Sequence, residues 1–340
     1  MARGAFPGGV LAVGRRGEVA HFLPFGRLRY EPEAPAVEAD TIYDLASLTK
    51  VVATTTVAMI LGEEGRLELD LPVATYLPGF VGPGKRQVTV RQLLSHSAGL
   101  AAWAPLYLEA RGPSAFLERI LAMALAYPPG SQSVYSDLGI LLLGEILERA
   151  SGTPFRRLVE SRVLEPLGLT ETGFLPGPSL LPRIAPTELD SSFRHRLLWG
   201  EVHDDNAFAL GGVAPHAGLF GTAPDLARFA TMMLEGGADP GGRLVSAETV
   251  AAFTRNAGVP GSSRALGWDT RSPEGSSAGS LLSLRAYGHT GFTGTSLWID
   301  PEREIFVLLL TNRVHPSRDR ELIREARPAL ADAAVRTLEI

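Results

Sequence analysis

The chain has 340 residues, of which 45% are hydrophobic and 20% are charged, and its formal net charge is -5 at neutral pH. These values are typical of a globular protein with a full core, and without a run of basic residues they argue against a nucleic-acid-binding surface. The chain has no cysteine, which excludes thiolate catalysis, disulfides and cysteine-ligated metal.

The sequence predicts no membrane-spanning or export segment. No stretch approaches the roughly eighteen consecutive apolar residues of a transmembrane helix. The start, from Met1 to Gly9, has no apolar segment of signal-peptide length. We therefore expect a cytoplasmic location for the chain as given.

The first predicted elements are a hairpin, a linker and a buried helix. Apolar or alternating runs at 10–13 and 18–25 flank a Gly-Arg-Arg-Gly turn, which is the pattern of a β-hairpin. Residues 31–40 are acidic and contain proline, as in a linker. Apolar residues then recur at spacings of three and four, which predicts a buried helix that begins near Ser47 and ends around 62–65.

The rest of the chain is first helical and then strand-forming. Up to about residue 235, Pro/Gly loops separate short helical patterns. The predicted helices there include 90–94, 113–126, 138–150, 154–163 and 225–234. Strand patterns return at 285–291, 295–300 and 304–311, and an amphipathic helix is expected at 318–338.

This order of elements predicts the fold class. An antiparallel sheet formed by the two ends of the chain, flanked by helices and interrupted by an inserted all-helical domain, gives an α/β (α+β) protein. We expect about 1–62 and 236–340 to form the α/β region and about 63–235 to form the helical insert. Together they would make one catalytic unit spanning 1–340.

Ser47 and Lys50 are the first candidates for chemistry. Residues three apart lie on one face of a helix, so the Lys50 amine is within reach of the Ser47 hydroxyl at a helix N-terminus that favours negative charge. A lysine desolvated in a pocket has a lowered pKa and can take the serine proton as a general base. The alternative is a lysine on the surface without a role.

The composition strengthens the catalytic interpretation of this pair. Of the 32 basic residues only Lys50 and Lys85 are lysines, so 32 minus 2, or 30, are arginines. Arginine cannot be deprotonated in a protein, so a position that needs a removable proton is one where arginine fails.

Two other segments are candidates to converge on Ser47. A Pro/Gly loop ends in Tyr135 and Asp137, just before a predicted helix. His289 and Gly291 lie on a late strand, where glycine permits close approach of a ligand.

Three motifs in this order resemble those of serine hydrolases of the penicillin-binding protein and class C β-lactamase type. They are Ser47-Leu48-Thr49-Lys50, Tyr135-Ser136-Asp137 and His289-Thr290-Gly291. The segments 93–100 and 218–229 are also similar to the family, so the resemblance covers nearly the whole chain. It implies a β-lactamase/transpeptidase-like fold and acyl-enzyme chemistry that needs no metal or organic cofactor.

The resemblance also implies a role for each matching residue. Ser47 would be the acylated nucleophile and Lys50 its partner in proton transfer. Tyr135 would be a general acid and base whose phenol pKa is lowered by the nearby ammonium. The strand His289-Thr290-Gly291 would flank the substrate, and the backbone N–H groups of Ser47 and Phe292 would form the oxyanion hole.

Two positions depart from the family pattern. Asp137 stands where asparagine is frequent, and an ionised carboxylate can only accept hydrogen bonds. His289 stands where lysine is frequent, and histidine is less surely charged at neutral pH. We therefore expect weak recognition of β-lactam carboxylates and a preference for a simple ester or a less anionic amide. Asp137 could also pair with Lys50, keep it protonated and move the base role toward Tyr135.

Further polar residues leave alternatives open. Arg313 either anchors a substrate carboxylate bidentately or points outward from a strand end. His96 is expected to fix a loop. Three residues, His203, Asp204 and His216, either bind a metal or, as we favour, line the cleft and hold one another by hydrogen bonds.

A second serine motif is present in the last third of the chain. Residues 275–279 match the G-x-S-x-G pattern of α/β-hydrolases, but that motif is meaningful only between a strand and a helix. Here it lies in a Ser/Gly loop before a strand, so we expect no nucleophile there.

The sequence thus predicts a hydrolase that acts on a small-molecule ester, amide or peptide, with no nucleic-acid partner. The alternatives are a penicillin-recognising sensor that is acylated without turnover, and an acyltransferase in which an alcohol replaces water.

Overall fold

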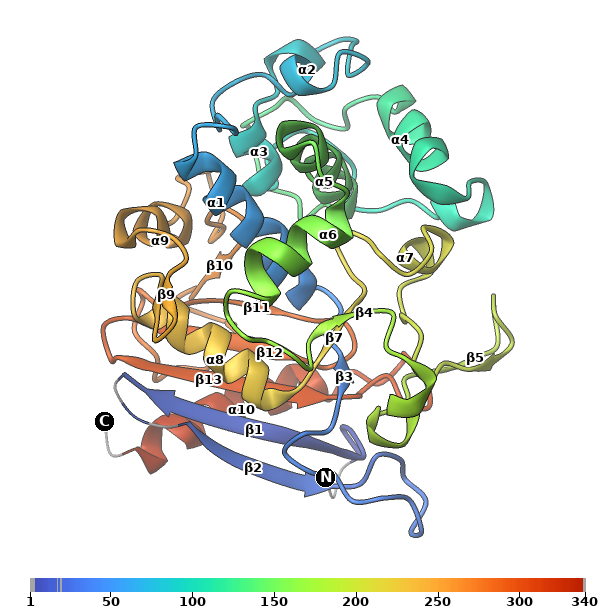
Figure 1. Ribbon diagram of the computed structural model, residues 1–340, viewed down its shortest axis with the longest axis vertical. Coiled ribbons are helices and arrows are strands. Elements are labelled where there is room, and N and C mark those ends of the chain that lie inside the picture. The colour runs from blue at the N-terminus through green and yellow to red at the C-terminus, as the bar shows by residue number, and fades with distance from the viewer. Residues whose placement is uncertain (1–3, 17, 19, 339–340) are drawn as a thin grey trace.

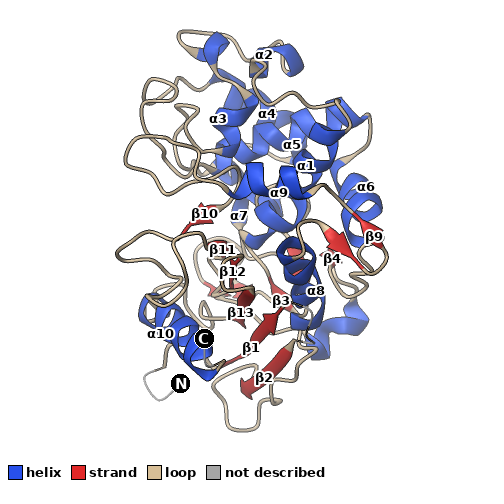
Figure 2. Ribbon diagram, turned by 90° about the vertical axis from the view of Figure 1, so that its left-hand side faces the viewer, coloured by secondary structure: helices blue, strands red, loops and turns tan. Residues whose placement is uncertain are grey.

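The computed structural model describes residues 4–16, 18 and 20–338. Gly17 and Val19 of the predicted hairpin, and the first three residues of the predicted start, lie outside the described residues. Strands and helices are segregated, with a sheet at one end of the molecule and most helices at the other (Figure 1, Figure 2).

The main sheet is antiparallel and joins the two ends of the chain, which confirms the predicted fold class. Its strand order is β10-β11-β12-β13-β1-β2. The strands are β1 (Gly8–Arg15), β2 (His21–Gly26), β10 (Asp269–Thr270), β11 (Tyr287–Thr290), β12 (Ser296–Asp300) and β13 (Ile305–Thr311). The N-terminal hairpin meets the C-terminal one along β1 and β13, where Val10 lies opposite Leu310 and Ala12 opposite Leu308.

Both faces of this sheet are covered, and the period of two along the strands decides which residue faces which helix. Phe306, Leu308 and Leu310 of β13 point into the main core, on the side of α8 (Ala223–Leu234). Val307 points to the opposite face and packs against Ala331 and Ala334 of α10 (Ile323–Thr337). This two-sided burial explains why β13 reads as a nearly unbroken apolar run.

Many of the helices between the two hairpins pack around α5. A π-helical segment (Lys50–Thr55) leads into α1 (Thr56–Glu63), and both contact α5 (Asp137–Ser151). The other α-helices are α2 (Val73–Tyr76), α3 (Val90–Leu94), α4 (Gly112–Ala122), α6 (Phe155–Val159), α7 (Asp205–Ala209) and α9 (Ala247–Thr254). Short strands complete the fold, namely β3 (Tyr43–Asp44), β4 (Gly173–Phe174), β5 (Leu189–Asp190), β6 (Arg196–Leu197), β7 (Leu219–Gly221), β8 (Ala238–Asp239) and β9 (Gly242–Arg243).

The predicted helices occur at the expected places, and their differences have local causes. The α4 helix ends at Ala122 rather than near 126 because Met123 turns extended and the Ala126 N–H donates to the Gly99 carbonyl at 2.7 Å. The segment predicted at 154–163 is α6 followed by a π-helical turn (Glu160–Leu164). In the described residues no helix is long and apolar enough to cross a membrane.

Candidate active site

Ser47 lies at the start of the buried helix, directly after a strained residue. Ala46 has a φ of 47°, a left-handed conformation that is costly for a residue with a side chain. Its N–H donates to the buried Asp44 carboxylate at 2.8 Å, which holds the turn in place. The π-helical segment that follows, Lys50–Thr55, is a rare form found frequently at functional sites.

Lys50 is completely buried and is surrounded by oxygen atoms. Its Nζ donates to Ser47 Oγ at 2.8 Å and to the carbonyl of His216 at 2.9 Å. The same Nζ lies 2.8 Å from Asp137 Oδ1, and the exposed fractions of the two side chains are 0% and 18%. The structure therefore brings the predicted serine, lysine and aspartate together around one nitrogen.

The expectation that Lys50 has a lowered pKa is wrong for the free enzyme. Burial does lower the pKa of Lys50, but the charge of Asp137 and the phenol of Tyr135 raise it more, so the pKa lies above its ordinary value. The structure agrees instead with the alternative raised from the sequence, in which Asp137 pairs with Lys50 and keeps it protonated. Lys50 is therefore an ammonium in the resting state.

Tyr135 lies in the same site, and the expectation of a lowered phenol pKa is also wrong. The Lys50 ammonium does lower it, yet burial raises it more, so the net direction is upward. The hydroxyl lies beside Lys50 and Ser47 without a fully formed hydrogen bond to a described residue. The Lys50 Nζ is 5.0 Å from the centre of the Tyr135 ring.

His96 has the structural role that the sequence suggested. Its ring packs 4.7 Å from the Tyr135 ring, and its Nδ1 accepts a hydrogen bond from the Ser136 N–H at 3.1 Å. Burial, followed by the positive charges of Arg264 and Lys50, holds the pKa of His96 well below its usual value. The neutral imidazole thus fixes the backbone between Tyr135 and Asp137.

His289 begins the third motif and is also neutral. Its ring lies 5.6 Å from that of Tyr135, and its Nδ1 lies 2.9 Å from the Thr290 carbonyl. Burial, and then the charges of Arg264 and Lys50, hold its pKa well below the ordinary value. This side chain therefore carries no positive charge at the position where many family members have a lysine.

Gly291 and Phe292 follow in the turn between β11 and β12. A Cβ at Gly291 would lie 2.6 Å from the Leu45 carbonyl, so only glycine allows the turn to come this close to the Ser47 segment. In the described residues neither the Ser47 N–H nor the Phe292 N–H donates to a protein acceptor. Both donors are free, as an oxyanion hole requires.

Two arginines, the buried Arg313 and the partly buried Arg327, hold this turn. Arg313 Nε donates to the Phe292 carbonyl at 2.7 Å, and its guanidinium lies 4.3 Å from the centre of the Phe292 ring. Its Nη1 donates to the carbonyls of Arg318 and Arg320. Arg327 Nη2 donates to the carbonyls of Gly291 and Thr295 at 2.6 and 2.8 Å. The structure thus supports neither expectation for Arg313, because it is buried and its Nε is not available for a bidentate carboxylate.

These groups line a cavity of about 760 Å³ between the sheet and the helical part. The site residues on its wall are Ser47, Tyr135, Asp137, His289, Thr290, Gly291, Phe292 and Arg313. The second serine motif also reaches the cavity through Ser277, which accepts a hydrogen bond from Trp298 Nε1 at 3.2 Å. Among the described residues no His, Lys, Asp or Glu side chain is hydrogen-bonded to that serine, and it does not lie at a helix N-terminus, so we interpret it as a loop residue.

The favoured alternative for His203, Asp204 and His216 agrees only in part with the contacts seen. His203 and Asp204 line the cavity and Asp204 pairs with His216, but His216 is not on the cavity wall and His203 pairs with a residue outside the three. His203 Nε2 lies 2.9 Å from the Glu188 carboxylate, and His216 Nε2 lies 3.0 Å from Asp204 Oδ1. Among the described residues no group of three or more His, Asp or Glu side chains has the arrangement of a metal site. The Asp204–His216 pair instead anchors the segment whose carbonyl accepts from Lys50.

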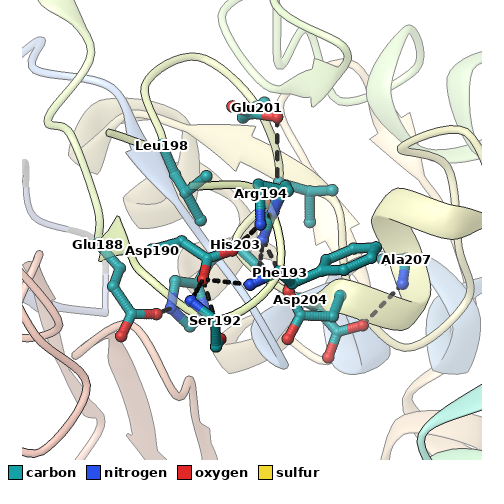
Figure 3. Close-up of polar contacts among 12 residues, drawn as sticks. Glu188, Asp190, Ser192, Phe193, Arg194, Leu198, Glu201, His203, Asp204 and Ala207 are labelled. Atoms are coloured by element: carbon teal, nitrogen blue, oxygen red, sulfur yellow. Dashed lines mark hydrogen bonds and ion pairs between the residues drawn. The ribbon is translucent and has the colours of Figure 1, made fainter. Parts of the chain in front are cut away.

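Buried charges behind this wall were not found from the sequence. Arg194 donates to the carbonyls of Val202 and His203 at 2.6 and 2.5 Å and to Asp205 at 3.0 Å. Figure 3 shows Arg194 among Asp190, Glu201 and His203. Asp190 accepts from the backbone N–H groups of Ser192, Phe193 and Arg194. The sequence carries no local signal for these partners, since a lone arginine in a polar loop looks like a surface residue.

Comparison with known proteins agrees with this geometry. The family model described as Beta-lactamase matches residues 1–331. A protein of Escherichia coli K12, provisionally named a D-alanyl-D-alanine carboxypeptidase, is 38% identical over 311 residues, covering 81% of this chain and 70% of its own length.

Solved structures show the same fold. A penicillin-binding protein homologue from Caulobacter crescentus is 27% identical, with a TM-score of 0.77 over 97% of this chain and 92% of its own. Another, from Pyrococcus abyssi, is 25% identical, with a TM-score of 0.76 over 99% of this chain and 74% of its own. The chain therefore belongs to the Beta-lactamase family and is a serine hydrolase.

Proposed function

We propose that this hydrolase cleaves the amide bond before a C-terminal D-amino acid through an acyl-enzyme on Ser47. The observation that carries the proposal is the buried Lys50 ammonium, which contacts both the Ser47 hydroxyl and the Asp137 carboxylate at 2.8 Å. The name given to the Escherichia coli relative supports the substrate class. The cavity is large enough for a peptide end.

The proposed reaction uses groups that already lie together. Lys50 and Tyr135 both have raised pKa values, so both are protonated in the resting enzyme. The reactive form is the one in which this pair has lost one proton and can accept another. That form takes the Ser47 proton as the oxygen attacks the carbonyl, and the free N–H groups of Ser47 and Phe292 stabilise the oxyanion. The proton then passes to the leaving amine, and water hydrolyses the ester on Ser47.

A second candidate is hydrolysis of simple esters. The neutral His289 and the acceptor-only Asp137 favour it, because both weaken recognition of an anionic amide substrate. Comparing p-nitrophenyl butyrate with nitrocefin tests this candidate. Efficient turnover of nitrocefin without esterase activity contradicts it.

The test of the main proposal combines mass spectrometry with turnover. Intact-mass measurement after incubation with a fluorophosphonate should show one adduct, which Ser47→Ala abolishes. Release of D-alanine from N-acetyl-D-alanyl-D-alanine should be continuous and absent in the same variant. Labelling without peptide turnover contradicts the peptidase, and a burst without a steady state indicates the sensor alternative. New esters formed with added alcohols indicate an acyltransferase.

A further inference from the structure

The two oxyanion donors lie on segments that are far apart in the chain. The Ser47 N–H follows the strained Ala46 at the start of the buried helix, and the Phe292 N–H belongs to the turn between β11 and β12. An oxyanion hole works only when both N–H groups point at one oxygen atom. The fold therefore needs a connection that sets one segment relative to the other.

Asp44 is the residue where these two segments meet. Its carboxylate Oδ1 accepts the Ala46 N–H at 2.8 Å, an Asx turn that fixes the backbone directly before Ser47. The backbone carbonyl of Asp44 accepts a hydrogen bond of 2.7 Å from Thr293 Oγ1, and that threonine directly follows Phe292. One residue thus contacts the chain neighbours of both donors.

The second carboxylate oxygen of Asp44 reaches Phe292 by another path. Asp44 Oδ2 accepts the backbone N–H of His203 at 2.7 Å. The His203 ring stacks on the Phe292 ring, with 5.6 Å between the ring centres and 29° between the planes. The carboxylate therefore holds the Ser47 segment with one oxygen and the contact partner of Phe292 with the other.

The fold keeps this carboxylate in a place where its charge is unfavourable. Asp44 is 2% exposed, and in the part of the chain that the structure describes no lysine or arginine lies within ion-pair distance of it. Burial raises the pKa of Asp44, and the N–H groups of His203 and Ala46 oppose that rise. An asparagine of the same size offers an acceptor oxygen at only one of the two positions, so it cannot serve both N–H groups.

We propose that Asp44 is a positioning residue that aligns both donors of the oxyanion hole. This role does not depend on which substrate is cleaved, but it rests on the acyl-enzyme chemistry proposed for Ser47. Asp44 is not among the described residues that line the cavity, so it does not touch a substrate there. Its loss should weaken stabilisation of the transition state and leave binding of the ground state unchanged.

The experiment uses Asp44→Asn and Thr293→Val, with p-nitrophenyl butyrate as the substrate. Asp44→Asn leaves one of the two N–H groups opposite an NH2 group, so kcat should fall about 10- to 100-fold with KM unchanged. Thr293→Val keeps the shape and removes only the hydroxyl that donates to the Asp44 carbonyl, so kcat should fall about 3- to 10-fold, again without a change in KM.

The matched control is Asp300→Asn. Asp300 is also buried, accepts backbone N–H groups with both carboxylate oxygens, and lies at the end of β12 that is remote from the Phe292 turn. This variant makes the same chemical change away from the cavity, so kcat should stay unchanged. Chemical denaturation of all the variants measures any loss of stability separately.

A transition-state analogue gives a second readout that a purely structural role would not move. The boron of butylboronic acid adds to the Ser47 oxygen as the serine proton is lost, and an oxygen of the tetrahedral adduct occupies the oxyanion hole. In Asp44→Asn the Ki of this inhibitor should rise by the same factor as kcat/KM falls. An unchanged kcat and Ki, or a rise in KM alone, overturns the inference.

Failure of the proposed function gives a different result. If the wild type hydrolyses no ester, the rate at which a fluorophosphonate labels Ser47 replaces kcat, because the phosphoryl oxygen needs the same two N–H groups. A labelling rate at least about 10-fold lower in Asp44→Asn supports the inference, and an equal rate overturns it. A wild type that is not labelled at Ser47 defeats the acyl-enzyme chemistry itself, and the role of Asp44 with it.

Discussion

Replacing Asp137 by asparagine should move the pH dependence of the reaction. Lys50 Nζ lies 2.8 Å from Asp137 Oδ1 and its side chain is fully buried, so the carboxylate is the group that keeps the amine protonated. An opposite charge at such a distance shifts a pKa by about one to three units. Asparagine retains the shape and an acceptor oxygen but removes the charge.

The sign of the effect follows from which form reacts. The pKa of Lys50 is raised in the folded enzyme, and the deprotonated pair accepts the Ser47 proton, so activity falls as pH drops through that pKa. Removing the negative charge lowers the pKa. The acidic limb of kcat/KM should therefore move by about one to three pH units toward lower pH in Asp137→Asn.

The assay is hydrolysis of p-nitrophenyl butyrate between pH 5 and about 10, which avoids any substrate carboxylate. Asp319→Asn is the control, because this carboxylate lines the same cavity but pairs with Ser317 rather than with Lys50. Thermal unfolding of each variant separates loss of fold from change of mechanism. An acidic limb that stays in place, or moves to higher pH, refutes the assigned role of the Asp137 charge.

Three further substitutions test the supports of the site. Gly291→Ala puts a Cβ 2.0 Å from a threonine oxygen, so kcat for p-nitrophenyl butyrate should fall at least about 10-fold. Gly173→Ala is the control, because a Cβ there has no atom within 4 Å, and it should leave kcat unchanged. Arg327→Gln releases two carbonyls of the turn that carries the Phe292 N–H, so kcat should fall about 10- to 100-fold with little change in KM. A change in KM alone contradicts this role. Arg194→Met removes the positive charge that is paired with the buried Asp190 and Asp205, and it should lower the free energy of unfolding by about 3 to 5 kcal/mol. Arg196→Met on the same loop, half exposed, should cost at most about 1 kcal/mol in chemical denaturation.

The element order was accessible from the sequence because local periodicity encodes it. The apolar run of β13 and the three-and-four spacing of the buried helix both appear as predicted. The end of α4 was not predictable, since a hydrogen bond to the distant Gly99 carbonyl ends the helical path. The division of the chain into an α/β region and a helical insert stays a prediction.

The sequence by itself determined which side chains meet, through Ser47 and Lys50 one helical turn apart and the motifs at Tyr135 and His289. Only the tertiary structure decided their charge states. The contact of Lys50 with Asp137 and the position of Arg264 over the Tyr135 ring join residues far apart in the chain, and the fold buries His289. A pKa depends on distance and burial in three dimensions, and no local pattern of residues records either quantity.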